Sequence, residues 1–108
     1  MARTPIHPGE ILADELAELG MNATELARLI NVSPNRISQI IAGKRAITAD
    51  TALRLGRWFG TGPHIWLNLQ QAYDLDLVRQ EIGSALENIL PCDAARARAT
   101  RPSSISAC

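Results

Sequence analysis

Residues 23–42, ATELARLINVSPNRISQIIA, limit the possible folds more than any other stretch of this 108-residue chain. Two short patterns with apolar residues three and four positions apart meet there at a brief interruption. Ala27 is small enough to let two helices cross closely, and Asn31 tolerates the left-handed backbone that a sharp turn needs. The apolar residues that would pin the second helix are Val32, Ile37 and Ile40. This spacing predicts a helix-turn-helix unit over residues 23–42.

Helix signals recur along the rest of the chain. Apolar residues are spaced by three and four almost throughout, and no run of strand length alternates apolar with polar residues. The chain is therefore predicted to be all-α. Four helices are expected from their start and stop residues: residues 7–19 before Gly20, a second from the capping pair Asn22 and Glu25, a third from Ser33 and Pro34 to Gly43, and a fourth from Thr48 to Gly60.

Each expected helix has one apolar face that predicts the core. These faces comprise Leu12, Leu16 and Leu19; Leu26, Ala27 and Ile30; Ile37, Ile40 and Ile41; and Leu53, Leu55, Trp58 and Phe59. We expect Trp58 and Trp66 to be core residues rather than platforms for stacked bases.

The helical pattern resumes at Pro63 and runs to Pro91, with an uncertain division near Tyr73. Two interpretations fit: a separate sixth helix capped by Asp74, or a bent continuation of the fifth. Residues 91–108 are small, polar and without periodicity. We therefore predict one domain over residues 1–90 and a flexible tail over residues 91–108.

Charge is strongly segregated although the formal net charge is zero. Residues 1–27 carry one Arg against five acidic residues, whereas residues 28–57 carry six Lys or Arg against Asp50 alone. Residues 58–90 are again acidic. A basic centre between acidic flanks indicates a polyanionic partner at one surface and a basic protein partner at another.

The second helix of the helix-turn-helix unit has a polar face suited to DNA. With its isoleucines committed inward, this helix must expose Ser33, Asn35, Arg36, Ser38 and Gln39. Arg pairs with guanine, and Asn and Gln pair with adenine, while Ser hydrogen-bonds to either base edges or phosphate. Lys44 and Arg45 follow directly and suit phosphate contacts. The alternative for any polar helix face is simple solvation; the turn spacing and local positive charge favour DNA.

Other classes of function find little support in the sequence. His7 and His64 have no Cys, Asp or Glu at metal-ligand spacing, so no metal or cofactor is expected. No strand-to-helix elbow carries a nucleophilic Ser, so we expect no enzyme. Cys92 and Cys108 lack a paired motif and are expected to be reduced thiols. Without a membrane span or secretory segment, the chain is expected in the cytoplasm.

Three blocks in order, HPGEIL, TELARLINVSPNRISQIIAGKRAITADTALRLGRWFGT and WLNLQQAYDL, resemble the HigA/VapI family of antitoxins. These belong to the phage-repressor-like, XRE-type helix-turn-helix proteins, and the resemblance covers about residues 5–80. The chain departs from the family pattern at two places: Asn31 stands where Gly is usual, and Ser-Pro-Asn opens the reading helix. Both departures bear on the DNA sequence recognised rather than on the fold. The resemblance implies a compact five-helix domain with an additional or extended C-terminal helix. It also implies a homodimer that binds its own operator and neutralises a co-encoded HigB/RelE-type toxin, an mRNA endonuclease.

Two further surfaces are candidates for protein partners. An RNA-cleaving toxin must be basic, so the acidic residues Glu10, Asp14, Glu15 and Glu18 are a candidate toxin surface, with an ordinary solubilising face as the alternative. The last helix carries more apolar surface than one small domain buries readily. Its candidate dimer interface consists of Leu75, Val78, Ile82, Leu86 and Ile89. A stand-alone repressor without a toxin remains the alternative function.

Overall fold

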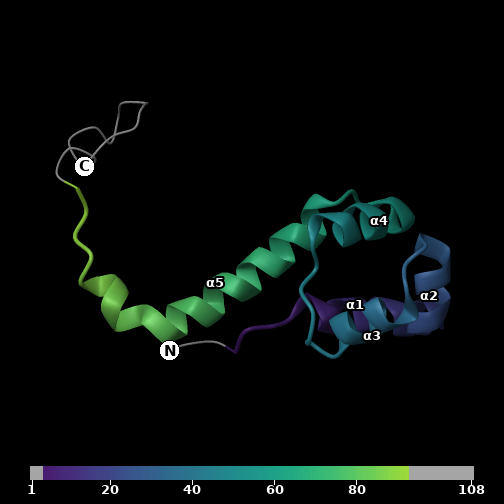
Figure 1. The fold of residues 1–108 in the computed structure, drawn as a ribbon, viewed down its shortest axis with the longest axis horizontal. Helices are drawn as coiled ribbons and strands as arrows, with labels where there is room; N and C mark the ends of the chain where they lie inside the picture. Colours follow the sequence, from purple (N-terminus) through teal and green to yellow (C-terminus); the bar gives the residue numbers. More distant parts are fainter. Residues whose placement is uncertain (1–3, 93–108) are drawn as a thin grey trace.

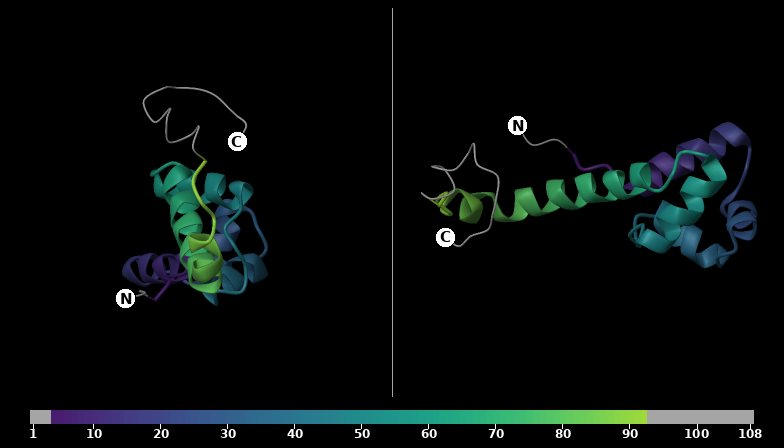
Figure 2. Two further views of the ribbon diagram at one scale, coloured as in Figure 1. Left: turned by 90° about the vertical axis from the view of Figure 1, so that its left-hand side faces the viewer. Right: turned by 90° about the horizontal axis from the view of Figure 1, so that it is seen from above.

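The computed structural model describes residues 4–92, which form five α-helices and no strand (Figure 1). The helices are α1 (Pro8–Leu19), α2 (Ala23–Ile30), α3 (Pro34–Ile41), α4 (Ala49–Phe59) and α5 (His64–Glu87). The first four gather at one end of the molecule, and α5 runs from that end far beyond them (Figures 1 and 2). The predicted all-α class and the five-helix architecture are confirmed.

The helix-turn-helix unit is built from the local signals that the sequence carries. Asn22 Oδ1 accepts from the Glu25 N–H at 2.8 Å, and Glu25 Oε1 accepts from the Asn22 N–H at 2.9 Å, so the capping box is complete. Asn31 ends α2 in the left-handed region, with φ of 63°. Since this conformation is costly for most residues with a side chain, Asn is a fitting occupant of the turn.

The ends of α3 and α4 also follow their signals. Ser33 Oγ accepts from the Arg36 N–H at 3.2 Å, and α3 ends at Ile41, two residues before Gly43 reverses the chain with φ of 77°. At α4, Thr48 Oγ1 accepts from the Thr51 N–H at 3.5 Å. Gly60 closes this helix in the left-handed region. The predicted caps of both helices are confirmed.

The cap of α1 is one that the sequence did not predict. His7 is the N-cap of this helix, and its Nδ1 accepts from the Gly9 N–H at 2.8 Å. The buried imidazole also contacts the ring of Tyr73 edge-on, with 4.8 Å between ring centroids. A polar acceptor directly before Pro8 was the available signal, but His is an unusual cap compared with Ser, Thr, Asp or Asn.

The core lies where α1, α2, α3 and α4 meet. Its fully buried members include Leu12, Leu26, Ala27, Ile37, Ile40 and Leu55. Trp66 of α5 joins them, and Trp58 is partly buried against the same cluster. Leu19 and Leu53, expected in the core, are instead 51% and 59% exposed. Leu19 is the last residue of α1, beyond the stretch that buries Leu12 and Leu16, and apolar spacing alone cannot mark where packing stops.

α5 is one helix with a bend, so the separate sixth helix predicted as one alternative is wrong. Asp74 is not a cap: it lies inside α5 and accepts from Gln70 Nε2 at 3.0 Å. The helix departs from regular geometry later, at Ile82, where φ is −114° and ψ is 16°. Its inner end is tied to the domain because Gln70 Oε1 accepts from the buried Ile47 N–H at 2.8 Å.

Two expectations concern the C-terminal part of the chain. Cys92 is disulfide-bonded rather than the reduced thiol expected. Sequence spacing could not reveal this, because a disulfide requires two Cβ atoms about 4 Å apart in space. Most of the predicted tail, including Cys108, falls in residues 93–108, outside the described residues. Within the described part, no helix has the length and apolar character needed to cross a membrane.

Candidate DNA interface

α3 divides into a buried apolar side and an accessible polar side. Ile37 and Ile40 are completely buried against the other helices. The exposed side chains of this segment are Ser33, Asn35 and Ser38, and Arg36 and Gln39 are partly exposed beside them. Helix packing therefore fixes which side of α3 can meet a ligand, and the five predicted polar residues are all on the accessible side.

The loop after α3 adds positive charge to this side. Lys44 and Arg45 are both exposed, as predicted for phosphate contacts. Arg45 Nε donates to Gln39 Oε1 at 2.9 Å. A Gln that pairs bidentately with adenine uses its amide oxygen as well as its NH₂ group. Arg45 therefore contacts the same oxygen that such a pairing would use, and the second lone pair of this oxygen is left to accept another donor.

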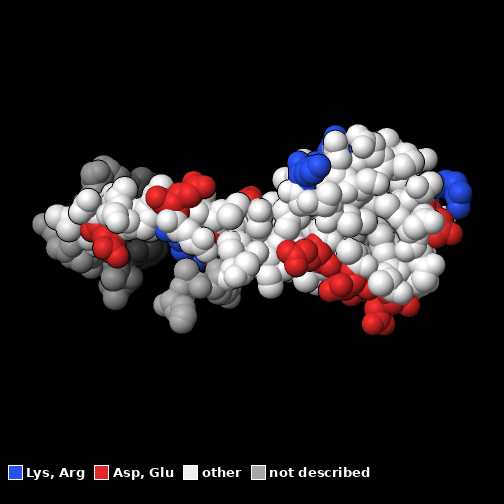
Figure 3. Space-filling view, turned by 90° about the horizontal axis from the view of Figure 1, so that it is seen from below, with Lys and Arg blue, Asp and Glu red and all other residues white. Residues whose placement is uncertain are grey.

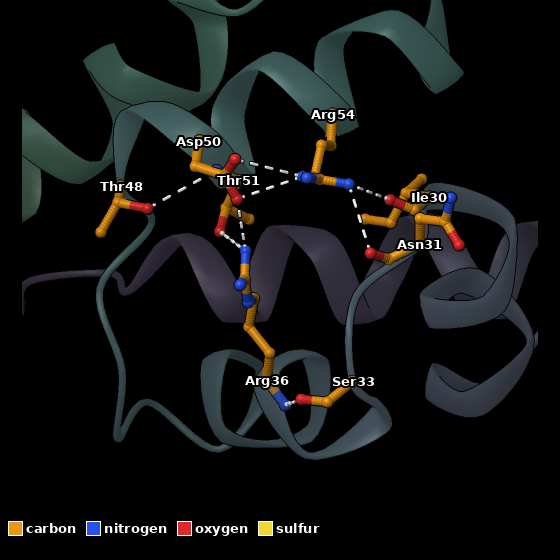
Figure 4. A network of polar contacts seen from close by, with 8 residues as sticks. All are labelled: Ile30, Asn31, Ser33, Arg36, Thr48, Asp50, Thr51 and Arg54. Carbon is orange, nitrogen blue, oxygen red and sulfur yellow. Dashed lines mark hydrogen bonds and ion pairs between the residues drawn. The ribbon is translucent and has the colours of Figure 1, made fainter.

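Arg36 is held at its tip by α4. Its Nη1 donates to Asp50 Oδ2 at 2.6 Å and lies 3.4 Å from Thr51 Oγ1 (Figure 4). Hydrogen bonds from Arg36, and then from Arg54, lower the pKa of Asp50, which keeps this carboxylate ionised. The guanidinium thus spans from α3 to the first turn of α4.

Arg54 connects the same carboxylate to the turn of the helix-turn-helix unit. Its Nε donates to Asp50 at 3.1 Å, and its Nη1 donates to the carbonyl oxygens of Ile30 at 2.8 Å and Asn31 at 3.2 Å (Figure 4). These carbonyls lie where α2 ends. By charge alone Arg54 is a further candidate for phosphate binding, but here its Nη1 group binds the turn and its Nε group binds Asp50.

The family of this chain follows from comparison with known proteins. The helix-turn-helix family model matches residues 12–66, which include the whole of α2, α3 and α4. Virulence-associated protein I of Dichelobacter nodosus is 53% identical over 77 residues, covering 70% of this chain and 71% of that protein.

Solved structures give the same result over more of the chain. A HigA-family addiction module antidote from Coxiella burnetii is 49% identical, with a TM-score of 0.81 over 83% of this chain and all of that one. Antitoxin HigA of Pseudomonas aeruginosa, solved with the higBA promoter, is 42% identical, with a TM-score of 0.77 over 82% of this chain and 98% of that one. The chain belongs to the HigA/VapI family of helix-turn-helix proteins.

The HigA-family chain carries an acidic surface away from its basic loop. Glu10, Asp14, Glu15 and Glu18 are all exposed on α1. Figure 3 shows acidic side chains in a row along one margin of the globular end, with basic side chains at other margins. The four predicted acidic residues therefore lie on one helix, and all four are accessible to a partner.

The same HigA-family chain leaves the outer part of α5 apolar and accessible. Within the helix the exposed fractions are 46% for Leu75, 45% for Val78, 40% for Ile82 and 47% for Leu86. Ile89, predicted to lie on this helix, follows its last residue Glu87 and is 68% exposed. α5 projects beyond the packed helices at this point (Figure 2). Side chains of this kind at such exposure are the usual material of a protein interface.

Proposed function

We propose that this chain is an antitoxin that binds operator DNA as a homodimer, represses its own operon and neutralises a HigB/RelE-type mRNA endonuclease toxin. The observation that carries the proposal is the accessible polar side of α3, fixed by buried Ile37 and Ile40 and followed by two exposed basic residues. The solved relative that contains a promoter, at 42% identity, supports it. Such a protein would work in the bacterial cytoplasm, at the nucleoid when operator-bound.

In this proposal α3 lies in the major groove. Asn35 and Gln39 contact bases, and Arg36 contacts a base or a phosphate. Ser33, Lys44 and Arg45 contact the DNA backbone, and Ser38 reaches either a base edge or a phosphate. Ser33 suits this role because its oxygen already accepts the Arg36 N–H, which leaves the hydroxyl hydrogen to donate.

Dimerisation follows from how such a helix reads DNA. One recognition helix contacts only a few base pairs, and a dimer gains specificity by placing two helices in successive major grooves about 34 Å apart. The exposed apolar side chains of outer α5 supply surface for this association. We therefore assign the dimer interface to Leu75, Val78, Ile82, Leu86 and Ile89.

Toxin binding is assigned to the acidic side of α1. An enzyme that binds RNA carries basic surface, which complements four exposed carboxylates on one helix. The toxin-binding residues proposed are Glu10, Asp14, Glu15 and Glu18. Charge complementarity of this kind contributes mainly to the rate and specificity of association.

The role of α3 in reading DNA is tested on the promoter of the operon by replacing Arg36 or Gln39 with Ala. Removing a side chain that reads a base should weaken operator binding by about 1–3 kcal/mol. The matched control is Gln71→Ala, at an exposed position of α5. Unchanged operator affinity and sequence preference in both α3 variants would show that α3 is not the reading helix.

Lys44→Ala tests the phosphate role separately. Without the Lys44 ammonium, binding to all sequences should weaken alike, and the slope of log affinity against log salt should decrease by about one unit. An unchanged slope, measured between low and physiological salt, would remove Lys44 from the interface.

The toxin arm is tested by co-purification with the product of the adjacent gene. Glu15→Lys with Glu18→Lys should weaken the complex, whereas Glu81→Lys, on outer α5, should leave it intact. If the neighbouring protein does not bind the unaltered chain, a stand-alone repressor is the better description. If it binds both charge variants equally, the toxin surface lies elsewhere.

A further inference from the structure

Asp50 stands out electrostatically beside the proposed DNA-binding side. It is the single acidic residue in residues 28–57, a segment with six Lys or Arg. A carboxylate near bound DNA repels phosphates and reduces affinity for any sequence. Its place in the first turn of α4 suits the helix dipole, but this does not account for its contacts with two arginines.

The contacts of Asp50 form a continuous connection from the turn to the reading helix. Arg54 bonds to the carbonyl oxygens of Ile30 and Asn31 and to the Asp50 carboxylate, and the carboxylate binds Arg36 at 2.6 Å (Figure 4). Thr51, next to Asp50 and buried, lies 3.4 Å from the same Arg36 nitrogen. Arg54 is thereby fixed to the backbone of the turn, and it fixes Arg36 in turn through the Asp50 carboxylate.

Stability alone accounts poorly for this arrangement. The side chains of Asp50 and Arg36 are 55% and 29% exposed, and ion pairs at such surfaces contribute little to folding. The effect on Arg36 is more direct. A long, flexible side chain that is already ordered loses less conformational freedom on binding, and its remaining guanidinium donors face a restricted set of positions.

We propose that Asp50 is a positioning residue that restrains Arg36, lowering affinity for DNA in general and raising discrimination in favour of the operator. The inference rests on the proposed DNA-binding role of α3. In this role Asp50 contacts no base. Its carboxylate holds Arg36 Nη1 against α4, and the other guanidinium nitrogens of Arg36 donate to the DNA.

Asp50→Asn tests this with little change of shape. The variant removes the charge while keeping an amide oxygen in the first turn of α4. Binding to DNA of unrelated sequence should tighten several-fold, with a salt slope steeper by up to about one, because freed Arg36 can neutralise a phosphate. The ratio of operator affinity to unrelated-DNA affinity should fall on the order of tenfold, about 1.4 kcal/mol. Asp50→Glu should restore part of this ratio.

The control for added positive charge is Glu81→Gln, which makes the same change in net charge on outer α5. It should leave the affinity ratio unchanged. In the Arg36→Ala background, Asp50→Asn should also leave the ratio unchanged, because no side chain remains to be positioned; this double-mutant cycle isolates the coupling. A folding defect would appear separately, as a lower unfolding midpoint.

Each outcome has a definite meaning. If Asp50→Asn leaves the ratio of operator affinity to unrelated-DNA affinity unaltered, the positioning role is overturned while the DNA-binding proposal stands. The same holds if Asp50→Asn lowers this ratio equally in the unaltered chain and in the Arg36→Ala background. If Arg36→Ala itself has no effect on operator binding, both this inference and the assignment of Arg36 to the DNA surface fail.

Discussion

The packed helices and the outer part of α5 use the same apolar spacing with opposite results. In α2 and α3, residues three and four apart such as Ile37 and Ile40 are completely buried. In outer α5, Val78, Ile82 and Leu86 have the same spacing but are 40–47% exposed. The molecule extends 53 Å along its longest axis because this part of α5 projects beyond the domain. Apolar periodicity therefore marks a face that needs covering, and does not say whether the chain itself covers it.

The two regions differ just as clearly at their glycines. At Gly9 an added Cβ would lie 1.8 Å from the carbonyl oxygen of Ile40, since the start of α1 packs directly on the end of α3. At Gly83, in outer α5, an added Cβ would meet nothing within 4 Å. One glycine is required by contact between two helices, and the other leaves space that the chain does not use.

Gly9→Ala should give the largest effect. The new methyl group must displace the backbone of α3, and overpacking of this kind costs about 3 kcal/mol of unfolding free energy. Gly83→Ala is the matched control and should be neutral or add about 0.5–1 kcal/mol through higher helix propensity. Denaturant unfolding followed by circular dichroism measures both. Equal effects at the two positions would contradict the contrast between a closed domain and an open helix.

The packed helices were well predicted from the sequence because their signals are local. The Asn22 and Glu25 capping box, the left-handed Asn31 and the caps at Thr48 and Gly60 each depend on chemistry within a few residues. The bend of α5 was less predictable. Asp74 offered a capping residue, yet Gln70, one turn earlier, bonds to it within a continuous helix.

The candidate site was predicted residue by residue but not as a network. Exposure of the polar side of α3 follows from burying Ile37 and Ile40 on the other side. The Arg36–Asp50 pair joins residues 14 apart on different helices, so only the crossing of α3 and α4 brings them together. The available signal was a lone carboxylate in a basic segment, which by itself indicates no more than compensation for the helix dipole.

Leu86→Ser tests whether a second copy covers outer α5. Burying one Leu contributes about 1.5–3 kcal/mol, so the dimer dissociation constant should rise roughly tenfold or more. Sedimentation equilibrium measures this constant, and Glu81→Ser is the control in the same part of the helix. The unfolding free energy of the dissociated chain should change by less than about 0.5 kcal/mol. Equal dimer dissociation constants for Leu86→Ser and Glu81→Ser would refute this interface. So would an unaltered chain that is monomeric at micromolar concentration.

The smallest effect is expected at His7, which joins the start of α1 to the inner part of α5. Burial lowers the pKa of His7 from its ordinary value of 6.5, although the charges of Asp74 and Glu10 oppose this shift. The geometry agrees, because Nδ1 accepts the Gly9 N–H and cannot do so when it carries a proton.

Since the unfolded chain takes up a proton at His7 more readily than the folded one, folding is favoured fully above pH 6.5 and progressively less as the pH falls below that value. Unfolding free energies measured between pH 7.5 and pH 5 should therefore fall more steeply for the unaltered chain than for His7→Asn, which keeps a cap acceptor but does not titrate. His64→Asn, at an exposed position, should keep the original dependence. The same dependence in all three proteins would mean that His7 does not link pH to the packing of α5.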